Sequence, residues 1–155
     1  MNLAKCINDQ LQRAPSEKGT EVLAVDDELR VYLKLADCDR LGCLLEKLNL
    51  EQTKEGRVAF DPAQIAAKVT YLGERLAVIE TEGRKGRTIL RSSPPRTDGE
   101  AIGFFEMVLD RSMGLSLERY TYDTRMGTRK RVTAPLTRDF LGRLIRDLIE
   151  LARAN

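Results

Sequence analysis

The chain has 155 residues, of which 42% are hydrophobic, 32% charged and 5% aromatic. This length suits one domain that can bury a core without help from a disulfide or a metal, and the ordinary apolar fraction argues against intrinsic disorder. No apolar run approaches the ~18 residues of a transmembrane helix, and the N-terminus lacks a signal-peptide core, so we expect a cytoplasmic protein with no membrane contact. We expect a single α+β domain over residues 1–155, with residues 1–19 at its periphery.

The sequence contains no histidine. This removes the Ser-His-Asp and Cys-His nucleophile pairs, histidine-ligated zinc and haem, and the usual general base near neutral pH. The three cysteines, Cys6, Cys38 and Cys43, form no CxxC motif and are too few for a closed zinc site, so we expect them to be reduced and packed as small apolar residues. The sequence favours a protein without enzymatic activity, cofactor or metal.

The first part of the chain predicts a helix followed by a hairpin. Leucine and isoleucine recur at four-residue steps over residues 3–12, as on one face of a helix. Residues 22–25 form a short apolar run. Residues 29–35 alternate between apolar and polar, which is typical of a strand with one solvent-exposed face. The acidic residues 26–28 lie between these strands and predict the hairpin turn.

Two further helices are expected before residue 76. Asp37 is a candidate N-cap, and the leucines within residues 41–48 would form the buried face of the helix that follows it. The second helix begins at Asp61, with Pro62 at the first helical position, where its missing N–H costs nothing. We expect this helix to end near Gly73.

Residues 76–134 read as about five strands joined by turns. The expected strands are 76–79, 87–91, 102–109, 115–123 and 129–134, with a loop over residues 92–99 and a bulge within 115–123. Short links between consecutive strands favour an antiparallel meander, because parallel pairs need long crossovers.

The last helix is the clearest element. Thr137 is a candidate N-cap, and apolar residues recur at three- and four-residue steps over residues 140–152. Such a wide apolar stripe must be buried, and the apolar face of the sheet can pack against it. The fold class is therefore α+β: an antiparallel meander of about five to seven strands packed against a C-terminal amphipathic helix, with two or three further helices.

The order of these elements resembles that of the lipid- and hormone-binding helix-grip folds. In those folds a strand, two helices, a meander and a long final helix follow one another. The resemblance implies a curved sheet gripping the final helix. It concerns the order of elements alone, and fold analogy does not give function.

The most basic part of the chain is residues 84–131, with 11 basic and 6 acidic side chains. If the strands on either side of a turn at residues 126–128 pair, Arg119 would lie near Arg131, and Tyr120 and Tyr122 would share a face. Together with Arg129, these side chains could bind an anionic small molecule or an acidic protein partner through bidentate hydrogen bonds from the arginines. A second interpretation is an edge hairpin whose charges prevent aggregation. Nucleic-acid binding is the weakest alternative, because the chain has no recognised nucleic-acid-binding signature.

Residues 102–109 carry bulky apolar groups on both faces. Phe105 and Met107 would face one side of the strand, and Phe104 and Val108 the other. One interpretation is a central strand that is buried on both faces. The other is that one face contacts a second copy of the chain or a ligand. Phe105 and Met107 are therefore candidates for the floor of an apolar pocket under the final helix.

Three hypotheses for function follow. The first is a small interaction or regulatory module without enzymatic activity that self-associates, most simply as a homodimer. The second is a carrier of an anionic, partly apolar small molecule, held between the sheet and the C-terminal helix. The third is an enzyme using Asp, Glu, Lys, Tyr or Cys, which ranks last because no nucleophile and base can be paired. The nearby carboxylates Glu80 and Glu82 are better explained as part of a wet sheet face.

Overall fold

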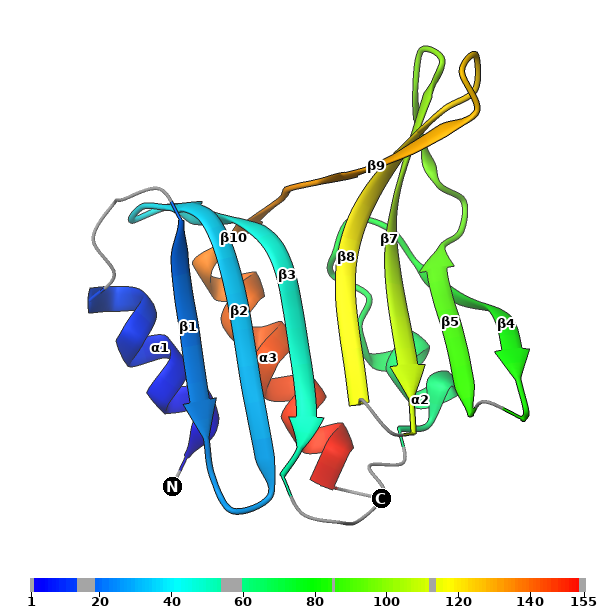
Figure 1. Ribbon diagram of the computed structural model, residues 1–155. Coiled ribbons are helices and arrows are strands. Elements are labelled where there is room, and N and C mark those ends of the chain that lie inside the picture. The colour runs from blue at the N-terminus through cyan, green and yellow to red at the C-terminus, as the bar shows by residue number, and fades with distance from the viewer. Residues whose placement is uncertain (1, 14–18, 54–59, 85, 112–113, 154–155) are drawn as a thin grey trace.

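A computed structural model describes residues 2–13, 19–53, 60–84, 86–111 and 114–153. Within these residues the chain forms three helices and ten strands, and all ten strands belong to one antiparallel sheet. The predicted α+β class, with an antiparallel sheet and a C-terminal helix packed on it, is confirmed (Figure 1).

The main path of the sheet has the order β1-β2-β3-β8-β7-β5-β4, and β6, β9 and β10 pair to one side of it. The helices are α1 (Leu3–Arg13), α2 (Pro62–Lys68) and α3 (Arg138–Arg153). The strands are β1 (Thr20–Val25), β2 (Leu29–Cys38), β3 (Gly42–Gln52), β4 (Leu76–Glu82), β5 (Arg87–Ser92), β6 (Arg96–Asp98), β7 (Ala101–Asp110), β8 (Gly114–Asp123), β9 (Thr128–Val132) and β10 (Ala134–Thr137).

Two antiparallel units meet in the middle of the sheet. Strands β1 to β3 form one unit, and β4, β5, β7, β8 and β9 form the predicted meander. The units join where Leu48–Leu50 of β3 pair with Leu115–Leu117 of β8. This short stretch of pairing, which we call the seam, makes the two units one sheet.

Beyond the seam, β3 and β8 separate and each takes a new partner. Gly42–Leu45 of β3 pair with β10, and Arg119–Asp123 of β8 pair with β9. At the same end, Ala101–Gly103 of β7 pair with β6. Strands β6 and β9 and the ends of β7 and β8 thus form a twisted projection, which we call the arm (Figure 1).

The helices cover one face of the sheet. Helix α1 buries Leu3, Ile7 and Leu11 and contacts β1 and α3. Helix α3 contacts β3 and β10, while α2 contacts β4 and β5 (Figure 1). The Oη of Tyr71, just after α2, donates to Oδ2 of the buried Asp147 on α3 at 2.8 Å, so the helices of the two units are joined on this face as well.

Three predicted end signals have the expected hydrogen bonds. In the β1–β2 turn, Oδ1 of Asp26 accepts the N–H groups of Glu28 and Leu29, both at 2.8 Å. Asp61 caps α2 through the N–H of Ala63 at 2.9 Å, and Thr137 caps α3 through the N–H of Phe140 at 3.1 Å. These short-range signals work because cap and turn side chains bond to the backbone next to them.

The helix predicted from Asp37 through residues 41–48 is wrong. These residues form the end of β2, a turn and strand β3, and Oδ1 of Asp39 accepts the turn N–H groups of Leu41 and Gly42. The leucine spacing resembles that of a helix because the register between β2 and β3 shifts. Lys34 pairs with Lys47 but Leu35 pairs with Leu45, so β3 has one extra residue. Leu45 and Leu48 are therefore buried three residues apart, as they would be in a helix, although both lie in a strand.

Smaller corrections concern the ends of elements. Helix α2 ends at Lys68 and not near Gly73, and the loop predicted over 92–99 contains the three-residue strand β6. The strand predicted over 129–134 is two strands, since β9 ends at Val132 and β10 begins at Ala134 and runs through Pro135. No bulge interrupts β8, which pairs with β7 in continuous register from Gly114 to Asp123.

The expectation of three reduced cysteines is also corrected. Cys38 and Cys43 face each other across the β2–β3 hairpin, with their Cα atoms 4.1 Å apart, and form a disulfide. Both are buried, while Cys6 on α1 is free and partly buried. The hairpin register brings the pair together, and the spacing of the cysteines in the sequence does not indicate it.

Two further properties concern the described part of the chain. None of its helices has the length and apolarity that crossing a bilayer requires. Nor do its Cys, Asp and Glu side chains gather in any group of three or more that could hold a metal ion.

We predict that Gly114→Ala weakens the seam. Gly114 has φ +93°, and a Cβ there would lie 2.2 Å from the carbonyl oxygen of Leu50. We expect the free energy of unfolding, measured by urea denaturation, to fall by about 3 kcal/mol. Gly99→Ala is the matched control, because Gly99 has φ +62° but no atom within 4 Å of its Cβ position. Its cost should be about 1 kcal/mol, and equal losses in the two variants would contradict the close approach at the seam.

Candidate functional site

Alternation along β8 separates the two faces of the sheet. Leu115 and Leu117 are buried on the face that the helices cover. Ser116, Glu118 and Tyr120 therefore lie on the opposite face, which we call the outer face. Register places Phe104 of β7 beside Tyr120 and Glu106 of β7 beside Glu118, so these side chains also belong to the outer face.

The centre of the outer face near the arm is a cluster around one buried carboxylate. Glu106 is only 8% exposed and receives two guanidinium groups. Nε of Arg91 on β5 lies 2.6 Å from its Oε2, and Nη2 of Arg129 on β9 lies 2.8 Å from its Oε1. A buried carboxylate held in this way fixes two arginines at defined positions. We call Arg91, Phe104, Glu106, Tyr120 and Arg129 the arginine–aromatic cluster.

The two aromatic rings of the cluster stack on each other and lie beneath its two arginines. The ring centroids of Phe104 and Tyr120 are 6.0 Å apart, with their planes 28° from parallel. The guanidinium carbon of Arg129 lies 3.6 Å from the centroid of Tyr120, and that of Arg91 lies 5.5 Å from the centroid of Phe104. Guanidinium groups stack favourably on aromatic rings, so each arginine is held by a carboxylate and by a ring.

A second carboxylate extends the cluster toward β3. Glu118 lies directly opposite Glu106, an arrangement of like charges that is unfavourable without compensation. Glu118 accepts a hydrogen bond of 2.8 Å from Oη of Tyr120. Lys47 lies 3.6 Å and Arg131 3.8 Å from its carboxylate oxygens. Counting Lys47, Glu118 and Arg131 with the cluster, four cations surround two carboxylates, so this part of the outer face is net positive.

The environment of the cluster shifts the pKa values of its members. Burial raises the pKa of Glu106, but hydrogen bonds from Arg129 and Arg91 and the charges of both outweigh it, so the pKa lies below its ordinary value. Burial, with the hydrogen bond to Glu118, raises the pKa of Tyr120 above its ordinary value. Near neutral pH Glu106 is therefore ionised and Tyr120 is a neutral hydrogen-bond donor.

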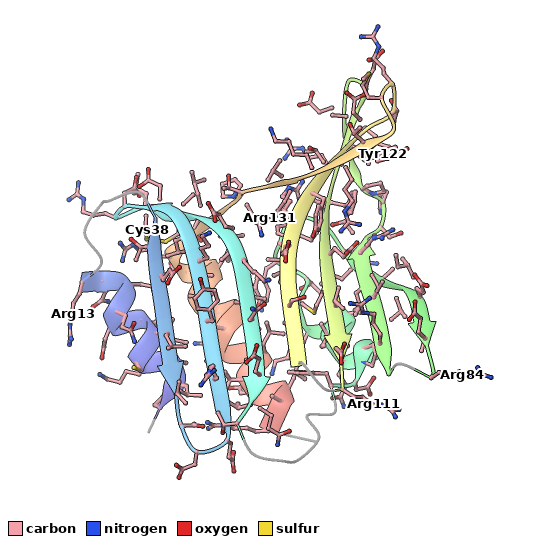
Figure 2. The ribbon with its side chains drawn as sticks, in the orientation of Figure 1. Arg13, Cys38, Arg84, Arg111, Tyr122 and Arg131 are labelled. Carbon is pink, nitrogen blue, oxygen red and sulfur yellow. A yellow bond between two sulfur atoms is a disulfide. The ribbon has the colours of Figure 1, made fainter. Side chains whose placement is uncertain are left out.

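The structure brings together only part of the predicted site. Tyr120, Arg129 and Arg131 lie on the outer face, where Tyr120 pairs with Arg131 between β8 and β9. Tyr122 pairs with Arg129 and lies farther along the arm, where its ring is partly exposed (Figure 2).

Three other predicted site residues lie on the helix-covered face. Arg119 pairs in register with Val132 and not with Arg131, so the two arginines lie on opposite faces of the arm. Nη1 of Arg119 lies 2.9 Å from Oε2 of Glu74, and its guanidinium carbon lies 4.7 Å from the ring centroid of Phe105. Phe105 and Met107 are themselves buried in the core.

Three of the five residues of the cluster were not in the predicted site. Sequence reasoning left out Arg91, Phe104 and Glu106, because their neighbours come from strands that are distant in the sequence. One signal was available in Glu106, which is a charged residue inside the apolar run 102–109. A charge in such a run needs a partner, and the basic residues of the neighbouring strands are the available partners.

A separate hollow borders the C-terminal helix. It measures about 680 Å³ and lies between α1 and α3, with Asn8, Gly142 and Arg146 among its lining residues. A Cβ at Gly142 would lie 3.0 Å from Oδ1 of Asn8, so this glycine lets α1 approach α3 closely. The hollow lies between two helices, whereas the predicted pocket would lie between the sheet and α3.

We predict that Glu106→Gln destabilises the protein at neutral pH by about 2 kcal/mol, because it removes the charge that holds Arg91 and Arg129. A lowered pKa in the folded state gives stability that is present above the unfolded-state pKa. That stability is lost as the pH falls through the folded-state pKa. Denaturant titrations from pH 7 to pH 3 should therefore show a steeper loss for the native chain than for the variant.

The control for this prediction is Glu100→Gln. Glu100 also pairs with an arginine, with Oε2 2.9 Å from Nε of Arg125, but both side chains are well exposed. An exposed pair contributes little, so this variant should follow the native chain within about 0.5 kcal/mol at every pH. A Glu106→Gln profile parallel to that of the native chain would contradict the assignment of Glu106 as the ionised centre of the cluster.

Comparison of the chain with protein-family models, with curated proteins and with solved structures finds no match.

Proposed function

We propose that the protein is an interaction module without enzymatic activity that binds an acidic protein segment on the outer face of its sheet. The single observation that carries the proposal is the placement of Arg91 and Arg129. The buried Glu106 holds both guanidinium groups, yet their side chains remain 36% and 37% exposed. Arginines fixed in advance lose little side-chain freedom when they bind a partner.

Carboxylates are well suited to the cations of this surface. A guanidinium group has five N–H donors in one plane, and one carboxylate occupies only some of them. The remaining donors of Arg91 and Arg129 suit the two oxygens of a further carboxylate. Arg131, whose side chain is 46% exposed, and Lys47 extend the positive surface along the same face. A segment with several Asp or Glu residues would complement this row of cations.

The geometry disfavours a nucleic acid as the partner. Proteins that bind single strands stack bases on aromatic rings, which need an accessible face. Here Arg129 lies over the ring of Tyr120, and Arg91 lies over the ring of Phe104. The rings therefore serve to hold arginines, and a base would have to displace them.

The proposal is tested with a fluorescein-labelled twelve-residue peptide rich in Glu and Asp, titrated with the protein in low salt and followed by fluorescence anisotropy. We expect saturable binding that weakens as salt is added. Arg129→Ala and Arg131→Ala should each weaken binding about tenfold, the effect of one charge-assisted hydrogen bond. Circular dichroism checks that each variant is folded.

Two controls make the test specific. Arg30→Ala removes an exposed arginine on β2, distant from the cluster, and should leave the peptide affinity within about twofold. A peptide with Gln and Asn in place of Glu and Asp should not bind. The proposal is overturned if the acidic peptide does not bind in low salt, or if Arg30→Ala has the same effect as Arg129→Ala. A single-stranded oligonucleotide that binds more tightly and depends on the same arginines would also overturn it.

A further inference from the structure

Strand β4 lies at one end of the main path of the sheet. Among the strands that the structure describes, it pairs with β5 alone. At the opposite edge, α1 contacts β1, and Nε2 of Gln10 donates to the backbone oxygen of Leu23 at 2.9 Å. An edge strand presents backbone N–H and C=O groups that can pair with another strand. Strand β4 is therefore a place where the sheet can be extended.

Two apolar side chains are exposed on β4. Val78 and Ile79 are each 45% exposed, and they are adjacent in the middle of the strand. Single exposed apolar residues are ordinary, but two together on an open edge are a feature of strands that pair with a partner.

Charges at the two ends of β4 are opposite in sign. Arg75 comes just before the strand and Glu82 ends it. Within the residues that the structure describes, neither side chain has an ion pair. A strand with an apolar centre, a cation at one end and an anion at the other is complementary to an antiparallel copy of itself.

The register of β4 permits such a pairing. Between Val78 and Glu80 the pairing with β5 shifts by one residue, so Ile79 is extra. Ala77, Glu80 and Glu82 pair with Arg91, Ile89 and Arg87 of β5, which alternate on the outer face. Alternation back from Ala77 also places Arg75 on the outer face, so the cation and the anion are on the same side of the edge.

We propose that the protein forms a homodimer in which β4 pairs antiparallel with β4 of a second copy about a two-fold axis. In this register Val78 lies opposite Ile79 of the partner copy, and Arg75 lies opposite Glu82. The irregular stretch of each strand, Val78 and Ile79, then lies opposite that of the other, so the outer-face residues meet on both sides of it. Although a bulge usually discourages edge pairing, only a strand with the same bulge matches this edge. The second copy is such a strand.

This dimer does not depend on the proposed binding of acidic segments, because β4 and the arginine–aromatic cluster are different surfaces. A two-fold axis perpendicular to the sheet would keep both outer faces on the same side. The dimer would then present two clusters on one surface, and a partner with two acidic segments would gain affinity through avidity.

The dimer is tested by sedimentation equilibrium over two decades of protein concentration. We expect a monomer–dimer equilibrium for the native chain. Arg75→Glu and Glu82→Arg each convert two attractive contacts into two repulsive ones, and each should weaken the dimer about tenfold. Arg30→Glu is the control, because it reverses a charge on β2, away from the edge, and should leave the dimer unchanged.

Mixing the two variants gives the decisive result. The β4 edge of the Arg75→Glu variant has an anion at both ends, and that of the Glu82→Arg variant has a cation at both ends. In a mixed dimer each anion therefore faces a cation, so both contacts are attractive again. We expect the mixture, and also the double variant Arg75→Glu with Glu82→Arg, to recover native association.

Three results would overturn the proposal. The native chain could be monomeric at every concentration, the single variants could dimerise as well as the native chain, or mixing the two variants could restore nothing. Each of these results is incompatible with paired charges at the two ends of β4.

Loss of the dimer can be distinguished from loss of the proposed function. If the native chain is monomeric but still binds the acidic peptide through Arg129, the inference about β4 fails and the proposed function stands. If the dimer forms and the peptide does not bind, the reverse holds.

Discussion

The seam between β3 and β8 is the interaction on which the rest of the structure depends. Only Leu48–Leu50 and Leu115–Leu117 pair across it, yet it joins a three-stranded unit to a meander. Leu48, Leu50, Leu115 and Leu117 are all buried, so the backbone ladder and the core are continuous at this point. Gly114 also lies at the seam. Only a residue without a side chain allows β8 to begin so close to the carbonyl oxygen of Leu50. On the outer face Lys47 and Glu118 bridge the same two strands.

The position of the candidate site depends on where β3 and β8 stop pairing. Past Leu117, β8 no longer faces β3 and pairs with β9, so the arm is not held by the first unit of the sheet. On the helix-covered face Arg119 takes the place that a leucine would occupy, and an ion pair with Glu74 replaces core packing. On the outer face Glu106, Arg91 and Arg129 tie the strands at the base of the arm together. The same contacts that stabilise the arm thus expose fixed cations, which links the stability of the arm to the proposed binding.

Local sequence signals were sufficient for the elements whose stabilising contacts are close in the sequence. The first helix, the β1–β2 hairpin and the last helix were predicted because periodicity, turn residues and caps act over a few residues. The helix predicted over 37–48 failed because a shift in pairing with β2 placed Leu45 and Leu48 three residues apart in a strand. Pairing with a distant strand decides such a shift, and a single sequence does not contain that information in any short window.

The same reason explains the partial success at the candidate site. Tyr120, Arg129 and Arg131 come from one hairpin, so a local argument could place them together. Arg91 and Glu106 join them through the β5–β7 and β7–β8 registers, which connect segments separated by turns and loops. Arg119 was predicted near Arg131, but the two do not share a face, because the hairpin register places Val132 opposite Arg119 and Arg131 opposite Tyr120. In a sheet one residue of register decides the face, so charge counts along the sequence located the basic region but could not tell which face carries it.

The proposed surfaces also explain why the two exposed features of the meander differ in character. The buried carboxylate of the cluster is paired with two arginines, so the cluster can remain exposed to water in a monomer. The other N–H donors of these arginines can bind an acidic segment. Val78 and Ile79 on β4 are apolar, and a strand paired beside them would reduce their exposure to water. In the proposed dimer Arg75 and Glu82 would favour a second copy, since a strand of unrelated sequence would leave both charges without partners. An apolar centre with self-complementary ends is therefore a better match for a second copy than for an acidic partner, which would face Glu80 and Glu82 with like charge.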